Sequence, residues 1–469
     1  MLEKLANIFR IPDLRKRVLF TLALLAVYRL GAHLTTPGID AIALSRLFDQ
    51  QRGTLLGFVD LFSGGNLRRL TIFALGIMPY ITASIILQLL TVVYEPLARL
   101  QKEGELGRKK ITQWTRYLTV ILGALQSLGI AATLQKGFGG QQLVLNPGIA
   151  FVLMTVLTLT TGTAFVMWLG EQITERGIGN GMSLLIFTGI VVGLPRAVAD
   201  LAEKVKTSAW GGLTAFAVIL LLVFMVAVVA FIVFVERSER RIPVQYAKRV
   251  VGRKVMGGQS THLPLRVNSG GVMPVIFASS VLTLPQTLGF AFERKPWYVG
   301  SFLNRFMDAL RWGEPLYTFL YAVGIIFFAY FYVSIVFNPN DVSSNMQKYG
   351  GFIPGIRPGQ RTSNHINEVL TRITLVGALY LILISIIPEW MITGIHLNNL
   401  PTWLGGSFFD KLPNVILHGF NVSFYFGGTS LLIVVGVAMD TVNQIESQLI
   451  MRHYEGFTPR SGRIKGRRW

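Results

Sequence analysis

The segment that decides the fold runs from Gly53 to Val93 and reads GTLLGFVDLFSGGNLRRLTIFALGIMPYITASIILQLLTVV. Its second half, Leu70–Val93, is long and apolar enough to cross a bilayer, which takes about 20 such residues. The first half is not, because Asp60 and the Arg68–Arg69 pair exclude exposure to lipid. Irregular backbone at membrane depth is tolerated only where it is buried in protein or lines a cavity. The first half therefore either lies on the outer membrane surface as an amphipathic segment or fills a cavity, and these residues alone favour neither interpretation.

The composition is that of a membrane protein that crosses the bilayer several times. The chain has 469 residues, of which 51% are hydrophobic and 14% charged, and its mean hydropathy is +0.51. It contains no cysteine, which excludes disulfides, thiol catalysis and cysteine-based metal sites. Its six histidines lie in loops or at the ends of apolar runs, and no His-Glu-x-x-His pattern is present. We therefore expect no catalytic residues, no metal and no cofactor.

Ten apolar runs predict an all-α polytopic fold with ten transmembrane helices. Proton- or sodium-coupled carriers usually hold a carboxylate near the middle of a span, and these ten runs hold none there. The predicted spans are Val18–Leu34, Leu70–Val93, Thr115–Leu134, Gly148–Leu169, Met182–Ala199, Leu213–Val235, Val272–Phe292, Leu316–Phe337, Ile373–Ile387 and Val422–Val442.

The distribution of lysine and arginine predicts the orientation of the chain. Most of them lie before the first span, after the last, or in connections on that same side, which places both termini in the cytoplasm. Ten spans divide into two halves of five, residues 1–205 and 206–469. An odd number of spans in each half would give the halves opposite orientations, as in inverted-repeat membrane proteins. The net charge of +20 also suits contact with anionic lipids and with acidic or RNA-containing partners.

Two long cytoplasmic connections carry much of this positive charge. Glu236–Gly271 mixes alternating residues with basic clusters, which predicts a β-ribbon with a basic tip. Asn338–Thr371 is rich in glycine and proline, which predicts a rigid irregular loop. These connections are either ordinary positive-inside loops or docking surfaces, and their length favours docking. The candidate docking residues are Arg249, Arg253, Lys254 and Arg357.

Five stretches, in one order along the chain, closely resemble the bacterial SecY family, the channel subunits of the Sec protein-export translocon. The resemblance covers nearly the whole chain. It implies two five-helix halves that form a clamshell around a central hourglass pore in the bacterial inner membrane. The stretches are FSGGNLRRLTIFALGIMPYITASIILQLLTVV, MWLGEQITERGIGNGMSLLIFTGIVVGLP, AKRVVGRKVMGGQSTHLPLRVN, GIRPGQRT and FYFGGTSLLIVVGVAMD.

The resemblance implies a plug within the pore and a lateral gate. The gate would separate the second and third helices from the seventh and eighth, where Thr82, Gln126 and Ser280 are polar. Those three residues are equally compatible with ordinary helix packing. The plug would run from Leu55 to Arg69, with Ser63–Gly65 as a flexible break. Its candidate residues are Leu55, Phe58, Leu61, Phe62, Ser63, Gly64, Gly65, Arg68 and Arg69.

A pore that passes a polypeptide needs an aqueous path, yet an empty path would leak ions. A narrow ring of aliphatic side chains resolves this conflict, because it dewets when empty and deforms around a passing chain. Ile77 and Ile81 lie four residues apart and share a helix face, and Met182 and Ile186 repeat that spacing. The ordinary alternative is that such residues face lipid or fill the core. The candidate ring, at positions to which the resemblance also points, is Ile77, Ile81, Met182, Ile186, Ile276 and Ile433.

The resemblance implies a protein-conducting channel that exports unfolded secretory proteins and releases membrane helices sideways into lipid. It implies the small membrane subunits SecE and SecG, the SecA ATPase, the ribosome, signal sequences and nascent chains as partners, with no direct DNA binding. The alternative is an inverted-repeat secondary transporter of a small solute, which explains the span count but not the basic loops. The outer connection Pro388–Asn421 is longer than usual in the family, and its apolar residues favour an interfacial amphipathic helix.

Overall fold

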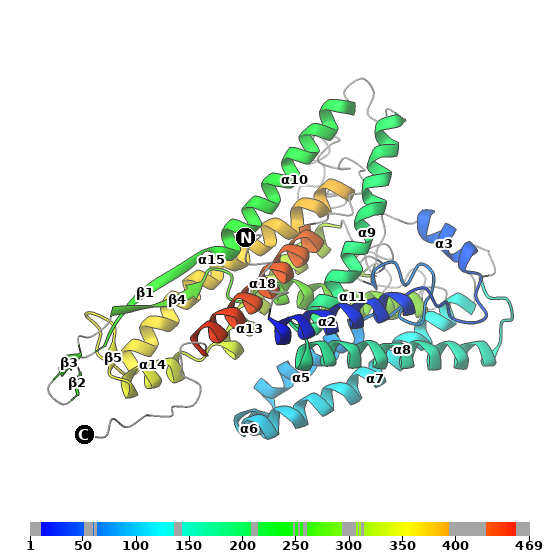
Figure 1. The fold of residues 1–469 in the computed structure, drawn as a ribbon. Helices are drawn as coiled ribbons and strands as arrows, with labels where there is room; N and C mark the ends of the chain where they lie inside the picture. Colours follow the sequence, from blue (N-terminus) through cyan, green and yellow to red (C-terminus); the bar gives the residue numbers. More distant parts are fainter. Residues whose placement is uncertain are drawn as a thin grey trace, which may run out of the picture.

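The structure of the protein is a computed structural model in which helices dominate (Figure 1). The predicted interfacial helix in Pro388–Asn421 lies almost entirely outside the described part of the chain. The structure describes residues 11–50, 60, 63–135, 143–207, 214–246, 249–251, 254–256, 260–292, 306–307, 309–310, 314–393 and 428–455.

A helix lies on each of the ten predicted spans, although the count of ten crossings is not confirmed. By length and composition, four helical segments in the described residues can cross a membrane, or five if the pair α5 and α6, bent by 104°, forms one span. The helices are α2 (Pro12–Gly31), α3 (Ala41–Gln50), α5 (Met78–Val93), α6 (Glu95–Lys102), α7 (Glu105–Gln135), α8 (Ile149–Arg176), α9 (Gly181–Lys206), α10 (Thr214–Arg237), α11 (Met273–Phe292), α13 (Pro315–Val336), α14 (Pro339–Lys348), α15 (Gln360–Thr393) and α18 (Gly428–Glu455).

The prediction of a helix throughout Leu70–Val93 is wrong for its first eight residues. Helix α5 begins only at Met78, with a proline in its first turn. Before it, the backbone pairs with the segment that follows α2, since Thr36 N donates to Leu70 O at 2.9 Å and Ile72 N donates to Leu34 O at 2.9 Å. Leu70 and Gly76 have φ angles of +40° and +55°, which no α-helix contains. The apolar run is therefore part turns and part helix.

The predicted β-ribbon is confirmed in the long connection after α10. Strand β1 (Glu239–Tyr246) pairs antiparallel with β4 (Ser260–Arg266), and the short strands β2 (Arg249–Val251) and β3 (Lys254–Met256) form its tip. Strand β5 (Gly351–Phe352), from the second basic connection, adds to the other edge of β1. Apolar residues of both connections then share one small core, namely Ile242, Val244, Leu265, Met346, Ile353 and Ile366.

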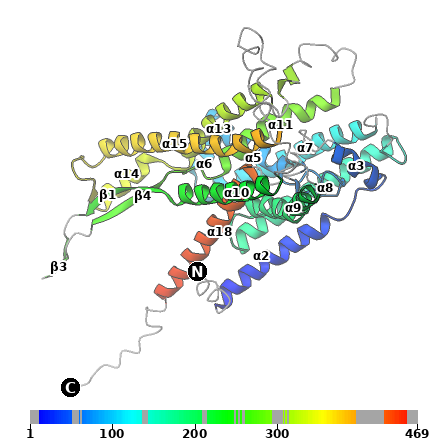
Figure 2. The same ribbon diagram turned by 90° about the horizontal axis from the view of Figure 1, so that it is seen from above.

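The helices of the chain pack around one large apolar core. It takes buried residues from α2, α5, α8, α9, α10, α11, α13, α15 and α18. In Figure 1 and Figure 2 the later helices α10, α13, α15 and α18 gather on one side with the ribbon at their end, and α2, α7 and α8 gather on the other. Helix α11 lies between the two groups and contacts both α5 and α7. Helix α11 therefore connects the two groups of helices.

Candidate functional site

The six ring candidates all belong to the large apolar core. Ile433 is fully buried, Ile276 is 3% exposed, and Ile77, Ile81 and Ile186 are 6–7% exposed. Met182 is half-buried and packs against the same cluster. These exposures exclude the lipid-facing interpretation. They agree both with core packing and with a closed constriction.

Each ring candidate lies beside a helix start, and the sequence explains why. Ile77 immediately precedes α5 and Ile81 lies in its first turn, while a proline in that turn fixes the start. Helix α9 begins after Asn180, whose Oδ1 accepts a hydrogen bond from Met182 N at 3.1 Å. Ile276 and Ile433 lie in the first two turns of α11 and α18. The starts of four helices therefore bring aliphatic side chains into one cluster. Interrupted helices likewise meet at the binding sites inside membrane transporters.

Of the predicted plug, the structure describes Asp60 and residues 63–69. The candidates Leu55, Phe58, Leu61 and Phe62 lie outside the described residues. Asp60 is buried, and its Oδ1 accepts hydrogen bonds from Arg68 N at 2.9 Å and from Ser63 Oγ at 3.4 Å. Gly65 N donates to Asp60 O at 2.9 Å. Asp60 lies outside the spanning helices, and burial raises the pKa of its carboxyl although the Arg68 donor opposes that rise. The Asp60 carboxyl therefore connects Ser63 and Arg68 by hydrogen bonds and stabilises the turn between them.

The expected flexible break at Ser63–Gly65 is packed at Ser63 and Gly64, whereas Gly65 has open space around it. Gly64 and Gly65 have φ angles of +72° and +80°, which favour glycine. A Cβ on Gly64 would lie 2.7 Å from Gly189 Cα in α9, so the two backbones touch. Beyond the break, Arg68 is half-buried and Arg69 is exposed. The backbone of Gly64 therefore packs against α9 three residues beyond the ring candidate Ile186.

The gate candidates lie on helices that meet, but their hydroxyls do not bridge the seam. Thr82 Oγ1 donates to Met78 O of its own helix at 3.0 Å. Ser280 is 3% exposed, and its Oγ has no hydrogen-bond partner among the described residues. Gln126 is half-buried on α7. Among the described residues, no hydrogen bond of these three side chains therefore joins α11 to α5 or α7.

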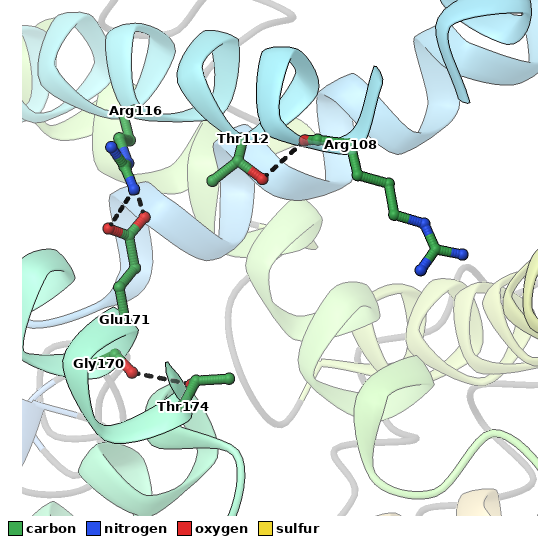
Figure 3. A network of polar contacts seen from close by, with 6 residues as sticks. All are labelled: Arg108, Thr112, Arg116, Gly170, Glu171 and Thr174. Atoms are coloured by element: carbon green, nitrogen blue, oxygen red, sulfur yellow. Dashed lines mark hydrogen bonds and ion pairs between the residues drawn. The ribbon is translucent and has the colours of Figure 1, made fainter. Parts of the chain in front are cut away.

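An ion pair that joins α7 to α8 was not predicted from the sequence. Arg116 reaches Glu171 with both branches of its guanidinium, Nε to Oε1 at 2.9 Å and Nη2 to Oε2 at 2.8 Å (Figure 3). One turn on, Thr174 Oγ1 donates to Gly170 O and accepts from Gly181 N, both at 2.9 Å. This joins the end of α8 to the start of α9. In the sequence, Glu171 lies just after the predicted span and stands in a polar stretch that reads EQITER, so nothing there singles it out as the partner of Arg116.

The docking candidates lie on the two short strands at the tip of the ribbon and on the loop before α15. Arg249 is in β2 and Lys254 in β3, whereas Arg253 lies outside the described residues. Arg357 is exposed, and its carbonyl accepts a hydrogen bond from Thr362 Oγ1 at 2.9 Å. Two glycines with positive φ, Gly355 and Gly359, bracket it. The prediction of an irregular loop is wrong for most of Asn338–Thr371, because α14, β5 and the start of α15 occupy that connection. It holds only for the short stretch between β5 and α15, in which Arg357 lies on a backbone held by Thr362.

The arrangement of helices resembles that of solved protein-conducting channels. The chain resembles the solved structure described as "The structure of a protein conducting channel", with a TM-score of 0.61 and 15% identity over 95% of this chain and 94% of that chain. It also resembles "The plug domain of the SecY protein stablizes the closed state of the translocation channel and maintains a membrane seal" (TM-score 0.59, 16% identity, 95% and 94%). A third is "Sec61 in the Canine ribosome-channel complex from the endoplasmic reticulum" (TM-score 0.56, 14% identity, 95% and 94%).

Sequence comparison identifies the family. The chain is 49% identical over 447 residues to protein translocase subunit SecY of Escherichia coli (strain K12), covering 94% of this chain and 93% of that protein. It is 47% identical over 457 residues to the same subunit of Vibrio cholerae serotype O1, covering 97% and 96%. The model of the SecY family matches residues 71–442. The chain belongs to the SecY family.

Proposed function

We propose that this chain forms the channel through which unfolded secretory proteins cross the membrane and from which membrane helices leave sideways into lipid. Its family is one of translocase channel subunits and not of enzymes. The observation that carries the proposal is the buried aliphatic cluster that six residues from four helix starts build together. A secondary transporter would need a coupling site, and neither the family nor the core supports one.

The proposed architecture is a clamshell of ten helices in two inverted halves, residues 1–205 and 206–469. Its support is the position of a helix on each apolar run and the place of α11 between two groups of helices. The chain is a bacterial membrane translocase subunit by family, and we propose the inner membrane as its location with both termini in the cytoplasm. The basic ribbon and the Arg357 loop then face the cytoplasm together.

The proposed partners are the small membrane subunits SecE and SecG, the SecA ATPase and the ribosome, together with signal sequences, nascent chains and anionic lipids. One structural relative is described in a ribosome–channel complex. The ribbon tip and the neighbouring loop supply guanidinium and ammonium groups that suit both carboxylate and phosphate partners.

Crosslinking tests the proposed function directly. The natural chain has no cysteine, so a single cysteine at one position of α5 or α11 reports on that position alone. A stalled secretory chain that carries a thiol-reactive probe should form adducts with cysteines on the pore-facing side of both helices. Adducts restricted to exposed positions of α10, such as Val226, would contradict a path between the two halves.

Deletion tests the proposed plug. Removal of Leu55–Gly65 should raise the ion conductance of the resting channel. The apolar side chains of the plug, such as Phe58 and Leu61, would no longer fill the outer side of the constriction. The measurement is single-channel conductance in a planar bilayer without a translocating chain. An amphipathic segment on the membrane surface predicts no change, so an unchanged conductance would favour that alternative.

Substitution tests the proposed lateral gate. Ser280→Leu should lower the hydrophobicity that a signal sequence needs, because a larger side chain at a buried seam position forces the helices apart. Thr82→Leu and Gln126→Leu should shift the same threshold by less, because Thr82 is hydrogen-bonded within its own helix and Gln126 is only half-buried. Ser334→Leu, on the exposed side of α13, is the matched control. An unchanged threshold in all three gate variants would leave ordinary packing as their role.

A further inference from the structure

The short link between strand β4 and helix α11, residues Val267–Val272, joins the proposed docking ribbon to the proposed gate helix. Val267 N donates to Ser238 O at 3.0 Å and so extends the ribbon ladder by one residue. At the other end, Ile276 N donates to Val272 O at 3.3 Å. Figure 1 shows α10 running directly into β1, with β4 beside it. The β4–α11 link is therefore hydrogen-bonded at both ends.

Asn268 ties this link to the end of α10. The residue is 6% exposed, and its Nδ2 donates to Glu236 Oε1 at 2.6 Å and to Gly271 O at 3.1 Å. Both amide hydrogens are thus used. Glu236 is the last residue but one of α10, and a hydrogen bond to a carboxylate is stronger than one between neutral groups.

Two further helices pack closely against the β4–α11 link, each at a glycine. A Cβ on Gly377 of α15 would lie 2.6 Å from Val267 O, and a Cβ on Gly436 of α18 would lie 2.6 Å from Val272 Cγ2. The link is therefore enclosed by α10, α15 and α18. In such surroundings a polar group that loses its partner bears the full cost of its desolvation.

The bond to Glu236 goes beyond what the local turn needs. The bond from Asn268 to Gly271 O, with Gly271 at a φ of +58°, is sufficient to close the turn before α11. The shorter bond crosses to another helix, and it fixes the start of α11 against the end of α10. Ile276 follows within one turn of that start.

We propose that Asn268, held by Glu236, is a positioning residue that sets the resting position of α11 and hence of Ile276 in the constriction. This rests on the proposed function, from which the roles of α11 and Ile276 come. The pair does not touch the translocating chain. It acts by keeping the first turn of α11, and the ribbon that leads to it, in register with the other helices of this half.

A polarity swap tests the pair. Asn268→Asp places two carboxylates in contact and should release the start of α11. Glu236→Gln keeps an acceptor for Asn268 and should have little effect. The double variant Asn268→Asp with Glu236→Gln restores one hydrogen bond of reversed direction, because the introduced amide can donate to the introduced carboxylate. It should recover the part of the loss that passes through Glu236, whereas the bond to Gly271 O is lost in both variants. Ser269→Ala, in the same turn, controls for general loosening of the link.

The readout is the reactivity of a single cysteine at position 276 in proteoliposomes that contain the full chain with its co-purifying subunits. We expect Asn268→Asp to raise its rate of labelling by an outside, membrane-impermeant maleimide about tenfold, the ratio that 1.4 kcal/mol produces. The hydrophobicity threshold for signal sequences should fall in parallel. If Asn268→Asp does not yield folded protein, Asn268→Ala is measured with the same readouts.

The outcomes separate this proposal from the proposed function. An Ile276→Gly channel, tested for ion leak in the same vesicles, reports whether position 276 seals the pore at all. A leaky Ile276→Gly channel with unchanged labelling in the Asn268 variant would overturn the positioning role alone. Equal labelling of position 276 in the single and double variants would also overturn the positioning role, since the change in labelling would then not depend on Glu236. A tight Ile276→Gly channel would contradict the ring itself.

Discussion

Arg357→Glu should abolish motor-driven export by a channel that still folds and inserts. The side chain is exposed, and the backbone of its loop is held by Thr362 and by the neighbouring glycines, so folding does not depend on the guanidinium. Loss of one member of a close charge pair at an interface costs about 2–5 kcal/mol, which weakens docking at least about thirtyfold. Charge reversal adds repulsion. The measurement is SecA-driven transport of a secretory protein into vesicles.

Two matched variants sharpen this test. Arg357→Lys keeps the charge but loses the planar fork that binds a carboxylate with two bonds, so it should fall between the parent and Arg357→Glu. Arg361→Glu makes the same change in net charge four positions along, at the start of α15, and it should retain most of the export. Normal transport by Arg357→Glu would contradict docking at this loop. Equal loss in both glutamate variants would indicate a general charge effect.

Local sequence patterns predicted the elements of this fold well. Each apolar run carries a helix, and the alternation in Glu236–Gly271 gives the ribbon that the structure contains. The i,i+4 spacing of aliphatic residues beside helix starts selected side chains that prove to be buried in one cluster. These features depend on neighbours a few residues apart, and a periodic pattern is sufficient to show them.

Contacts between distant residues were not predictable in the same way. The non-helical conformation of the chain before α5 includes backbone hydrogen bonds to Leu34 and Thr36, which the apolar run does not reveal. Asn268 and Glu236 are 32 positions apart, and Arg116 and Glu171 are 55 apart. Each pair forms only when separate elements pack together. A single sequence contains no periodicity that would connect them.

Glycine at Ile81 or Ile276 should give a resting channel that leaks ions and accepts defective signal sequences. Each side chain is at least 93% buried, and each lies in the first turn of its helix beside the other ring candidates. Removal of a buried aliphatic side chain typically costs about 2–5 kcal/mol and leaves a cavity that its neighbours fill only in part. In a constriction, that cavity is a path for water, because dewetting requires a narrow apolar ring.

The control for this prediction is Val226→Gly. Val226 is an aliphatic residue of α10 that is 70% exposed, and glycine there carries the same helix penalty of about 1 kcal/mol without opening a cavity in the core. Ion leak is measured in vesicles under a membrane potential, and signal stringency with a graded set of signal sequences. If Ile81→Gly and Ile276→Gly both stay tight and stringent, the six residues are core packing and the constriction lies elsewhere. All three glycine substitutions weaken a helix, but only those at Ile81 and Ile276 leave a cavity at the ring. If Val226→Gly leaks as much as the other two variants, the leak therefore comes from weakened helices and not from a cavity.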